Sequence, residues 1–319
     1  MNKACALIRL SRLYVENANA ISGDLTWGFP APSAFLGFAH VLERRLNSIK
    51  LGGVGIVCHS FDPQVAYPDG PFRPGRFRLS CYPYIAGWKK FKNERSAILE
   101  EGKAHLEVSL LIEVHTELRE EECQDLDQRM KSIVPTLRLA GGSIRGDPNI
   151  QTRVWPEWEE DQRKDFRKIR YHLLPGFVLV QSQGFLDPNT TFMSMESAEA
   201  STLGIFLDRF ALYWDPPDEK ARRSEWQVRS KPGWLVPLPV GYAALSPLCQ
   251  PGSVAHARDP TVPFRFVESL YTVGQWLSPH RLTSLEQMLW YSEADLEKGL
   301  YLCRNGYYQS AKETQDVEY

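Results

Sequence analysis

The sequence predicts an α+β fold, with a ferredoxin-like, RRM-type N-terminal domain followed by a Pro-rich, mixed α/β C-terminal region. Apolar patterns in the first half follow the order strand, helix, strand, strand, helix, strand, with an extra helix and strand. A basic and aromatic segment, 71–95, interrupts this order as a hairpin insertion. Proline is dense between 214 and 264, which excludes long helices there. We therefore expect two domains, 1–190 and 191–319.

The first elements follow from residue type and spacing. Residues 4–15 read as a strand, and 17–33 have the Asn, Gly, Pro and Ser content of a loop. The continuous apolar run 54–61 predicts a central strand, and the alternation over 102–114 predicts a half-buried one. A helix is expected to start at a capping Ser33 and to bury one face. That face holds Phe35, Phe38, Val41, Leu42 and Leu46.

The remaining elements are assigned in the same way. A polar, acidic helix is expected over about 118–132, with Pro135 ending it. A strand and turn at 137–144, a helix at about 157–173 and a strand at 175–182 complete the first half. In the second half a helix starts near 195 and leads into short strands. Two further helical pieces are expected around 264–277 and 283–291.

Composition excludes several classes of protein. The 319 residues carry 37 Lys plus Arg and 39 Asp plus Glu, a net charge of −2, so this is no strongly basic arm protein. Six scattered cysteines lack the paired spacing of zinc or redox sites, so we expect reduced thiols, no metal and no cofactor. We also expect no signal peptide and no membrane span, and hence a cytoplasmic protein.

Catalytic motifs are weak. Ser60 beside His59 and Ser278 near His280 are the only suggestive neighbours, and neither lies in a G-x-S-x-G elbow. No His pair has the spacing of a zinc peptidase helix. We therefore predict that the chain is not an enzyme.

A Gly-rich turn offers a phosphate site. Gly141, Gly142 and Ser143 lie between Arg138 and Arg145, so backbone amides can approach a phosphate while two guanidinium groups neutralise it. The alternative is a tight turn between sheet and helix.

Two basic segments are interleaved with aromatic residues, as single-stranded RNA binding requires. In 71–95 the candidate contacts are Arg76, Arg78, Lys89, Lys90 and Lys92. The alternative there is a solvated hairpin whose rings pack on a partner protein. In 220–234 the candidates are Arg229, Lys231 and Trp234, and the alternative is a loop lying over the sheet.

Several stretches carry a family resemblance that runs from about residue 7 to 301. The chain resembles the second Csy subunits of type I-F CRISPR surveillance complexes, which are Cas-five-type members of the RAMP superfamily. The stretches are NANAISGDLTWGFPAPSAFLGFAHVLERR, GVGIVCHSF, EEGKAHLEVSLL, LRLAGGSI, LLPGF, WQVRSKPGWLVPLPVGYAALSP, RFVESLYTVGQWLSPHR and LWY.

The resemblance implies a non-catalytic RNA-binding role. Such a subunit pairs with the large Csy subunit, binds the 5′ handle of the CRISPR RNA, caps the filament of backbone Csy subunits, and reaches target DNA only through the assembled complex. The insertion 71–95 would then be the thumb laid across the guide. We place the handle against the turn at 138–145 together with Arg9, Arg12, Asn17 and Asn19. Trp27 is a further candidate RNA contact.

Two alternatives remain open. Some Cas-five-type proteins cleave RNA, so the chain would then be a metal-independent RAMP endoribonuclease using a His or Tyr near the guide. A purely structural scaffold subunit, whose basic segments touch only acidic partner surfaces, is the other.

Overall fold

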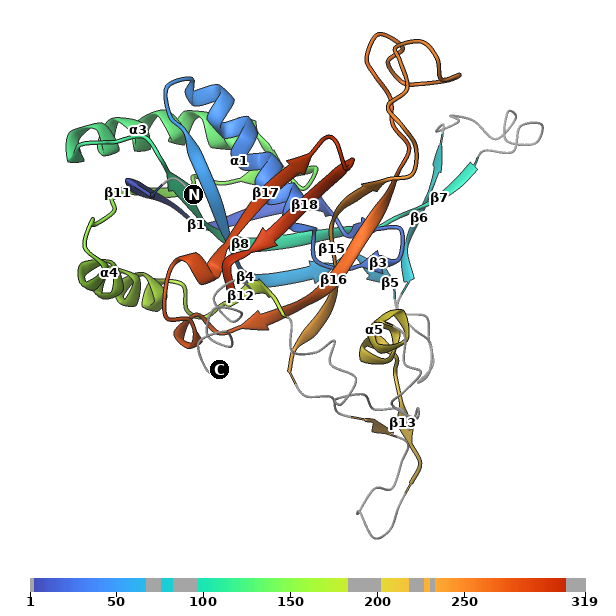
Figure 1. Ribbon diagram of the computed structural model, residues 1–319. Helices are drawn as coiled ribbons and strands as arrows, with labels where there is room; N and C mark the ends of the chain where they lie inside the picture. Colours follow the sequence, from blue (N-terminus) through green and yellow to red (C-terminus); the bar gives the residue numbers. More distant parts are fainter. Residues whose placement is uncertain are drawn as a thin grey trace, which may run out of the picture.

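A large antiparallel sheet with helices on both faces organises the molecule (Figure 1). The computed structural model describes residues 3–66, 76–82, 97–182, 202–217, 227–229 and 233–307. The main sheet has eleven strands, in the order β12-β16-β15-β18-β17-β4-β8-β1-β10-β9, with β11 also paired to β1. The α+β class predicted from the sequence is confirmed.

The first half has the predicted alternation of strands and helices. The order along the chain is β1 (Ala6–Asn19), α1 (Pro32–Leu46), β4 (Leu51–Pro63), β8 (Lys103–Val114), α3 (Glu120–Ile133), β9 (Arg138–Leu139), β10 (Gly142–Arg145) and β11 (Asn149–Val154). In space β8 lies between β4 and β1, and β10 and β11 share the other edge of β1. All these pairings are antiparallel.

The second half closes a ring of strands onto β4. The elements are α4 (Glu159–His172), β12 (Phe177–Gln181), α5 (Thr202–Phe210), β13 (Trp214–Asp215), β14 (Gln227–Val228), β15 (Leu235–Ala244), β16 (Val267–Leu277), β17 (Leu289–Asp295) and β18 (Leu300–Asn305). One edge of β4 pairs first with β17 and then with β12. Because β12, β16, β15, β18 and β17 are joined in sequence, this edge brings them round into a ring. The boundary proposed at residue 190 stays a prediction, although strands from both sides of it share one sheet.

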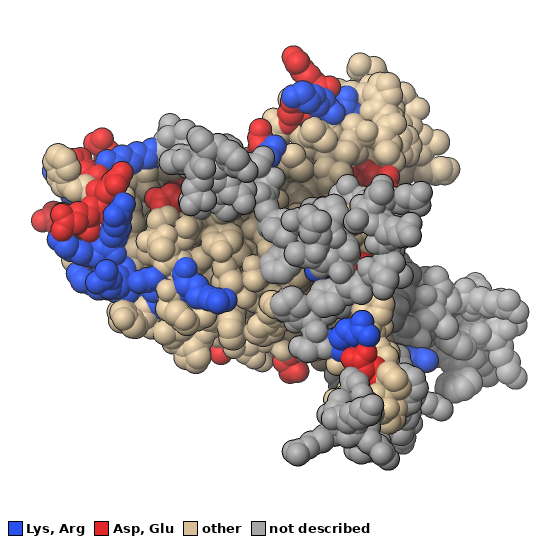
Figure 2. All heavy atoms as spheres, turned by 60° about the horizontal axis from the view of Figure 1, so that its bottom comes forward, with Lys and Arg blue, Asp and Glu red and all other residues tan. Residues whose placement is uncertain are grey.

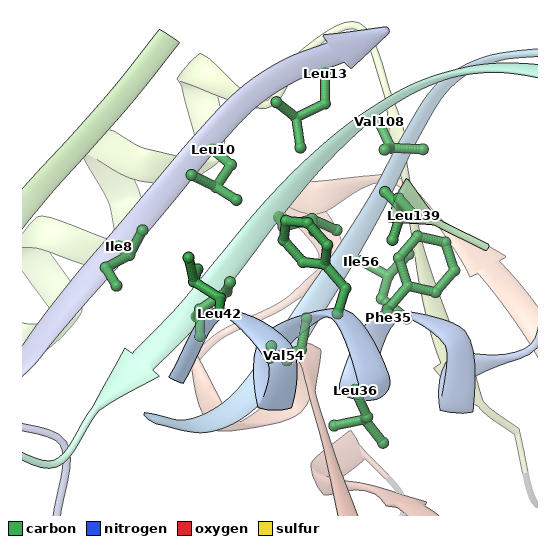
Figure 3. Packing of buried hydrophobic residues seen from close by; sticks show 14 of the residues in the cluster. Ile8, Leu10, Leu13, Phe35, Leu36, Leu42, Val54, Ile56, Val108 and Leu139 are labelled. Carbon is green, nitrogen blue, oxygen red and sulfur yellow. The ribbon is translucent and has the colours of Figure 1, made fainter. Parts of the chain in front are cut away.

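Helices α1 and α3 cover one face of the sheet. Leu10 of β1, Ile56 of β4 and Val108 of β8 pack against Phe35 and Leu42 of α1 (Figure 3). Leu126 and Met130 of α3 join the same cluster. The alternation predicted for 102–114 therefore directs every second residue of β8 into this core.

The opposite face has its own core under α4. Leu7, Val57 and Leu111 point to this side and pack with Phe166 and Ile169 of α4. A strand buried on both faces reads as a continuous apolar run, which explains the pattern at 54–61.

Two predicted helices are wrong. Residues 264–277 contain β16, which pairs with β15 along one edge and β12 along the other. Residues 283–291 hold one 3-10 turn, Glu286–Met288, followed by the start of β17. In both segments, pairing with strands distant in sequence decides the conformation. The predicted helix from 195 is observed as α5, and residues 195–201 lie outside the described part of the chain.

Other details of the first half also differ. Helix α1 begins at Pro32 after Ala31, and no side chain caps it, so Ser33 is not the cap. Proline suits this first position because its missing N–H has no helical partner. Val41 is exposed rather than buried. The expected loop 17–33 instead contains the end of β1 and the short strands β2 (Ile21–Gly23) and β3 (Thr26–Trp27).

The basic insertion is described in part. A small sheet holds β5 (Val65–Ala66), β6 (Arg76–Tyr82) and β7 (Ala97–Glu101), with β6 and β7 antiparallel. Residues 67–75 and 83–96 lie outside the described part.

Among all the residues that the structure describes, no helix is long and apolar enough to cross a membrane.

Candidate nucleic-acid interface

A groove of about 740 Å³ brings together part of the predicted handle site. Asn19, Arg138 and Gly141 line it, together with the first turn of α1 from Ala31 onward. Tyr242 of β15 and Val267 and Ser269 of β16 form its other wall. The groove therefore lies where the N-terminal strands meet the C-terminal ring.

The turn between β9 and β10 has the conformation that exposes backbone to a ligand. Ala140 and Gly141 both have positive φ, 49° and 76°. The Ala140 carbonyl accepts a 2.8 Å hydrogen bond from the Asn19 N–H, and the Arg138 side chain donates to the Gly141 carbonyl at 3.1 Å. Arg138 stays exposed, so its guanidinium keeps donors for a phosphate.

The start of α1 lines the groove beside Arg138. The first N–H groups of a helix lack helical partners and carry partial positive charge. No side chain caps α1, but Pro32 has no N–H and Ala34 donates to the Ala31 carbonyl at 3.0 Å, so the start of the helix adds few free donors beside the Arg138 guanidinium. The lining also holds the carboxylate of Asp24, so the positive side chain of Arg138 is matched by one negative side chain in the groove.

Three other predicted contacts are engaged within the protein. Asn19 holds a local turn, donating to the Ile21 carbonyl at 2.9 Å and accepting from the Ile21 N–H at 3.1 Å. Asn17, with φ 56°, accepts a 2.6 Å bond from Gln64. Arg145 pairs with Glu16 at 2.8 Å.

Arg9 and Arg12 lie elsewhere on β1, so the predicted site is not one surface. Arg12 sits at a bulge and pairs with Glu107 at 2.6 Å. Arg9 is ten residues from Asn19 along the strand, which at about 3.3 Å per residue is roughly 30 Å. Arg9 therefore does not reach the groove that holds Asn19 and Arg138.

His59 takes part in a hydrogen-bond chain rather than in a pair with Ser60. Its Nδ1 lies 2.6 Å from the Pro175 carbonyl, and its Nε2 lies 2.7 Å from the Ser109 hydroxyl. A carbonyl only accepts, so Nδ1 carries the proton and Nε2 accepts from Ser109. Burial lowers the pKa of His59, which favours this neutral form.

Aromatic side chains line a second pocket of about 410 Å³. Trp27 and Trp234 are about half exposed at this pocket, whereas Trp276 is buried. The Trp234 ring lies 4.9 Å from that of Phe177, edge to face. Exposed indole rings of this kind provide surfaces on which an unstacked base can lie.

The basic insertion approaches this aromatic pocket. The Phe77 ring lies 4.7 Å from that of Trp27, and the neighbouring Arg76 is exposed. The backbone of Arg78 pairs with Glu101. Lys89, Lys90, Lys92 and Lys231 lie outside the described residues.

Arg229 is already paired. It forms a 2.7 Å ion pair with Asp215 and lies over the Tyr213 ring. The paired carboxylate partly neutralises its attraction for phosphate.

Comparison with known proteins decides the family. Residues 8–303 match the family described as CRISPR-associated protein (Cas_Csy2). A CRISPR-associated protein Csy2 from Pseudomonas aeruginosa (strain UCBPP-PA14) is 44% identical over 313 residues, covering 93% of this chain and 94% of that protein. The chain belongs to the Csy2 family. The resemblance to second Csy subunits predicted from the sequence is thereby confirmed.

Sequence reasoning missed several residues of these sites. Phe177 and Ser109 carried no motif, because strand pairing alone brings them to the aromatic pocket and to His59. Tyr242 and Ser269 join the groove through the C-terminal ring, for which the sequence order gives no signal. Among the described residues, no three His, Cys, Asp or Glu side chains gather as a metal site would require.

Proposed function

We propose that the chain is a non-catalytic CRISPR RNA-binding subunit of a type I-F surveillance complex. It binds the 5′ handle of the guide RNA together with the large Csy subunit and caps the filament of backbone Csy subunits. The observation that carries this proposal is the groove where Arg138, Gly141 and the uncapped start of α1 meet. Family membership supports the same assignment.

The order of the N-terminal strands supports a RAMP-type RNA-binding core. Strands β4, β8, β1 and β10 lie side by side and are all antiparallel, with α1 and α3 packed on one face. This is the order of a ferredoxin-like or RRM fold. We infer that the insertion carrying β6 and β7 is the thumb, which extends from the main sheet in Figure 1.

The two pockets suit different parts of RNA. The groove at Arg138 offers a guanidinium and backbone amides, which position a phosphate without reading sequence. The aromatic pocket offers Trp27 and Trp234, which stack on unpaired bases. Together they would hold a bent single strand by its backbone and its bases.

An apolar projection suits the protein partner. The segment joining β15 to β16 extends from the body of the molecule (Figure 1) and exposes Leu245, Leu248 and Phe266. Such side chains favour contact with another protein. We propose the large Csy subunit as this partner, and a cytoplasmic complex that presents the guide to target DNA.

RNA binding by the chain co-expressed with the large Csy subunit tests the proposal. Fluorescence anisotropy would compare a handle RNA with a scrambled sequence. Arg138→Ala should weaken both about tenfold, because a charged hydrogen bond contributes about 1.5 kcal/mol or more. The matched control is Arg44→Ala, an exposed arginine near the other end of α1. Equal effects of the two changes would contradict the proposal.

The same material separates the alternatives. Cleavage of a repeat RNA that is lost on His59→Ala, with assembly intact, would indicate the endoribonuclease. Assembly without any salt-dependent RNA crosslink to this chain would indicate the scaffold subunit.

A further inference from the structure

A positively charged cavity lies on the opposite face of the sheet from α1. It measures about 260 Å³ and lies where α4 packs beside β1 and β11. Its polar lining comes from Arg9 of β1, Gln151 and Arg153 of β11, and Lys168 and His172 of α4. Figure 2 shows Lys and Arg side chains gathered on the side of the molecule that carries α4, next to acidic ones.

The cavity places like charges together without a carboxylate in its lining. Although its backbone pairs with β1, the side chain of Arg153 makes no ion pair or hydrogen bond within the described part of the chain. The nearby positive charge of Arg153 lowers the pKa of Arg9, after the larger effect of burial. Lys168 pairs with Asp165 at 3.0 Å, but the Asp165 carboxylate lies outside the cavity lining. It neutralises Lys168 and leaves the charges of Arg9 and Arg153 uncompensated. An anion bound in the cavity would reduce the repulsion between these positive charges and so stabilise the folded protein.

Arg9 shows where hydrogen bonding is incomplete. Its Nη2 donates to the Gln151 side-chain oxygen at 2.6 Å. Its Nε is buried and has no hydrogen-bond partner among the described residues. A buried donor without an acceptor is unfavourable, so a ligand oxygen that accepts a hydrogen bond from the Arg9 Nε would be stabilising.

Gln151 supplies a neutral donor to the same space. Because its carbonyl oxygen accepts from Arg9, its NH₂ group is the part that remains to donate. The cavity therefore presents donors from two strands and one helix, converging from several directions. That arrangement suits a compact anion whose oxygens each accept more than one hydrogen bond.

We propose that this cavity binds a phosphate group of a nucleic acid. A phosphodiester has two charged non-bridging oxygens, and each can accept more than one hydrogen bond, so a single group can accept from Arg9, Arg153 and Lys168 together. The sequence grouped Arg9 with the handle contacts, but the structure assigns it to this separate cavity. The two sites lie on opposite faces of the sheet and roughly 30 Å apart along β1, so a strand contacting both would have to pass around the sheet.

The source of the phosphate rests on the proposed function, because only an RNA-binding subunit brings a nucleic acid here. The chemistry of the cavity does not rest on it. Guide RNA, target DNA and inorganic phosphate all carry a phosphate group, so binding at the cavity must be measured with each of them separately.

Protection of arginine side chains from chemical modification measures binding at the cavity. The complex with the large Csy subunit would be treated with phenylglyoxal, which modifies accessible guanidinium groups, and Arg153 and Arg167 would be compared by mass spectrometry. Arg167 is the matched control, an exposed arginine of α4 outside the cavity lining. Inorganic phosphate, a single-stranded RNA and a single-stranded DNA would be added separately. Protection of Arg153 by at least about threefold, with Arg167 unchanged, is expected for inorganic phosphate and for the strand that supplies the group.

Salt dependence gives a second measurement on variants. Arg153→Ala should reduce the slope of log affinity against log salt for the protecting single strand, by at most about 0.7, because Arg9 and Lys168 still face the same phosphate. Arg167→Ala should leave the slope unchanged. Equal modification of Arg153 with and without every anion would overturn the proposal. So would an unchanged slope combined with weaker capture of the large Csy subunit, which would assign a protein carboxylate.

These measurements distinguish failure of the proposed handle binding from failure of the proposed phosphate site. If the complex binds no RNA handle but inorganic phosphate still protects Arg153, the cavity is confirmed as a phosphate site and the handle proposal is lost. If Arg138→Ala weakens handle binding but Arg153 is never protected, the handle proposal stands and this inference is overturned.

Discussion

The hydroxyl of the buried Ser109, on β8, lies 2.7 Å from the imidazole of His59, on the neighbouring strand β4. The same hydroxyl accepts from the Arg12 N–H at 2.9 Å. Arg12 and His59 each lie where the register with β8 shifts, one in β1 and the other in β4. Such bulges remove backbone pairing locally. Ser109 therefore supplies the bonds that the two strands lose.

Replacing Ser109 should destabilise the sheet. In Ser109→Ala, the Arg12 N–H loses its acceptor and His59 loses its donor, and both lie in a partly buried region. We expect a loss of about 1–3 kcal/mol in the free energy of unfolding, measured by urea denaturation with the m-value unchanged. Ser132→Ala, at an exposed position on α3, should change it by less than about 0.5 kcal/mol. Equal midpoints for the two variants would contradict this role.

The hydrogen-bond chain also predicts a pH dependence. Burial lowers the pKa of His59 below its ordinary value of 6.5, so the unfolded chain binds the proton more readily than the folded one. Stability from neutral His59 is therefore fully present above about pH 6.5 and is lost as pH falls towards the folded pKa.

A matched variant isolates this effect. His59→Gln removes the titration, so the difference in unfolding free energy between wild type and variant should shrink as pH is lowered from about 7.5 to 5. A difference that stays constant over that range would show that His59 titrates alike in both states.

The strand and helix order of the first half could be predicted, because each element buries one face with a regular period. Leu106, Val108 and Leu110 alternate into the core as the sequence indicates. The C-terminal strands could not be predicted in the same way. Val267–Leu277 becomes β16 only because β15 and β12 are present on either side, and its local pattern does not encode that pairing.

The candidate site shows the same division. The turn at Gly141 was predicted because glycine reports on backbone geometry locally. The separation of Arg9 from Asn19 was missed because 17–33 was expected to be a loop, which could fold back towards Arg9, whereas the strand continues to Asn19. Arg153 and Lys168 carried no motif, since only the packing of α4 on β11 brings them to Arg9.

The two glycines of the turn should respond differently to substitution. A Cβ on Gly142 would lie 2.7 Å from the Glu16 carbonyl oxygen and 2.8 Å from the Ala18 nitrogen, both backbone atoms of β1. Gly142→Ala should therefore separate β10 from β1, at about 1–3 kcal/mol of stability, and weaken handle binding.

Gly141 is the matched comparison. It has nothing within 4 Å of an added Cβ, but its φ of +76° favours glycine. Gly141→Ala should cost about 1 kcal/mol through the backbone alone, and Gly141→Asn should recover much of this. Thermal denaturation of the three variants checks both expectations. Equal losses for Gly142→Ala and Gly141→Asn would show that close approach to β1 does not matter.

Trp234 tests the aromatic pocket as a base-stacking surface. It is 55% exposed at the pocket, so Trp234→Ala should weaken capture of the handle by about 1–3 kcal/mol without changing the salt slope. Trp158→Ala is the control, since Trp158 is 75% exposed beside α4, outside the pocket lining. A change in slope, or an equal effect of both variants, would argue against stacking.

The projecting segment between β15 and β16 predicts dependence on a partner. Its base is ordered, with hydrogen bonds of 2.7 Å and 3.0 Å joining the backbones of Cys249 and Phe264. Leu248 nevertheless stays 53% exposed, and burying a leucine side chain contributes about 1.5–3 kcal/mol. We expect the chain expressed alone to aggregate, and co-expression with the large Csy subunit to keep it in solution.

Leu248→Asp separates partner contact from folding. The change should reduce co-purification of the large Csy subunit about tenfold or more while leaving the Tm unchanged, because the Leu248 side chain is 53% exposed. It should also make the isolated chain more soluble, since it removes apolar surface and adds charge. Tyr171→Asp, an exposed apolar position on α4, controls for the added charge. Full recovery of the complex with Leu248→Asp would place the partner on another surface, because an acidic residue cannot replace leucine in a dry contact without loss.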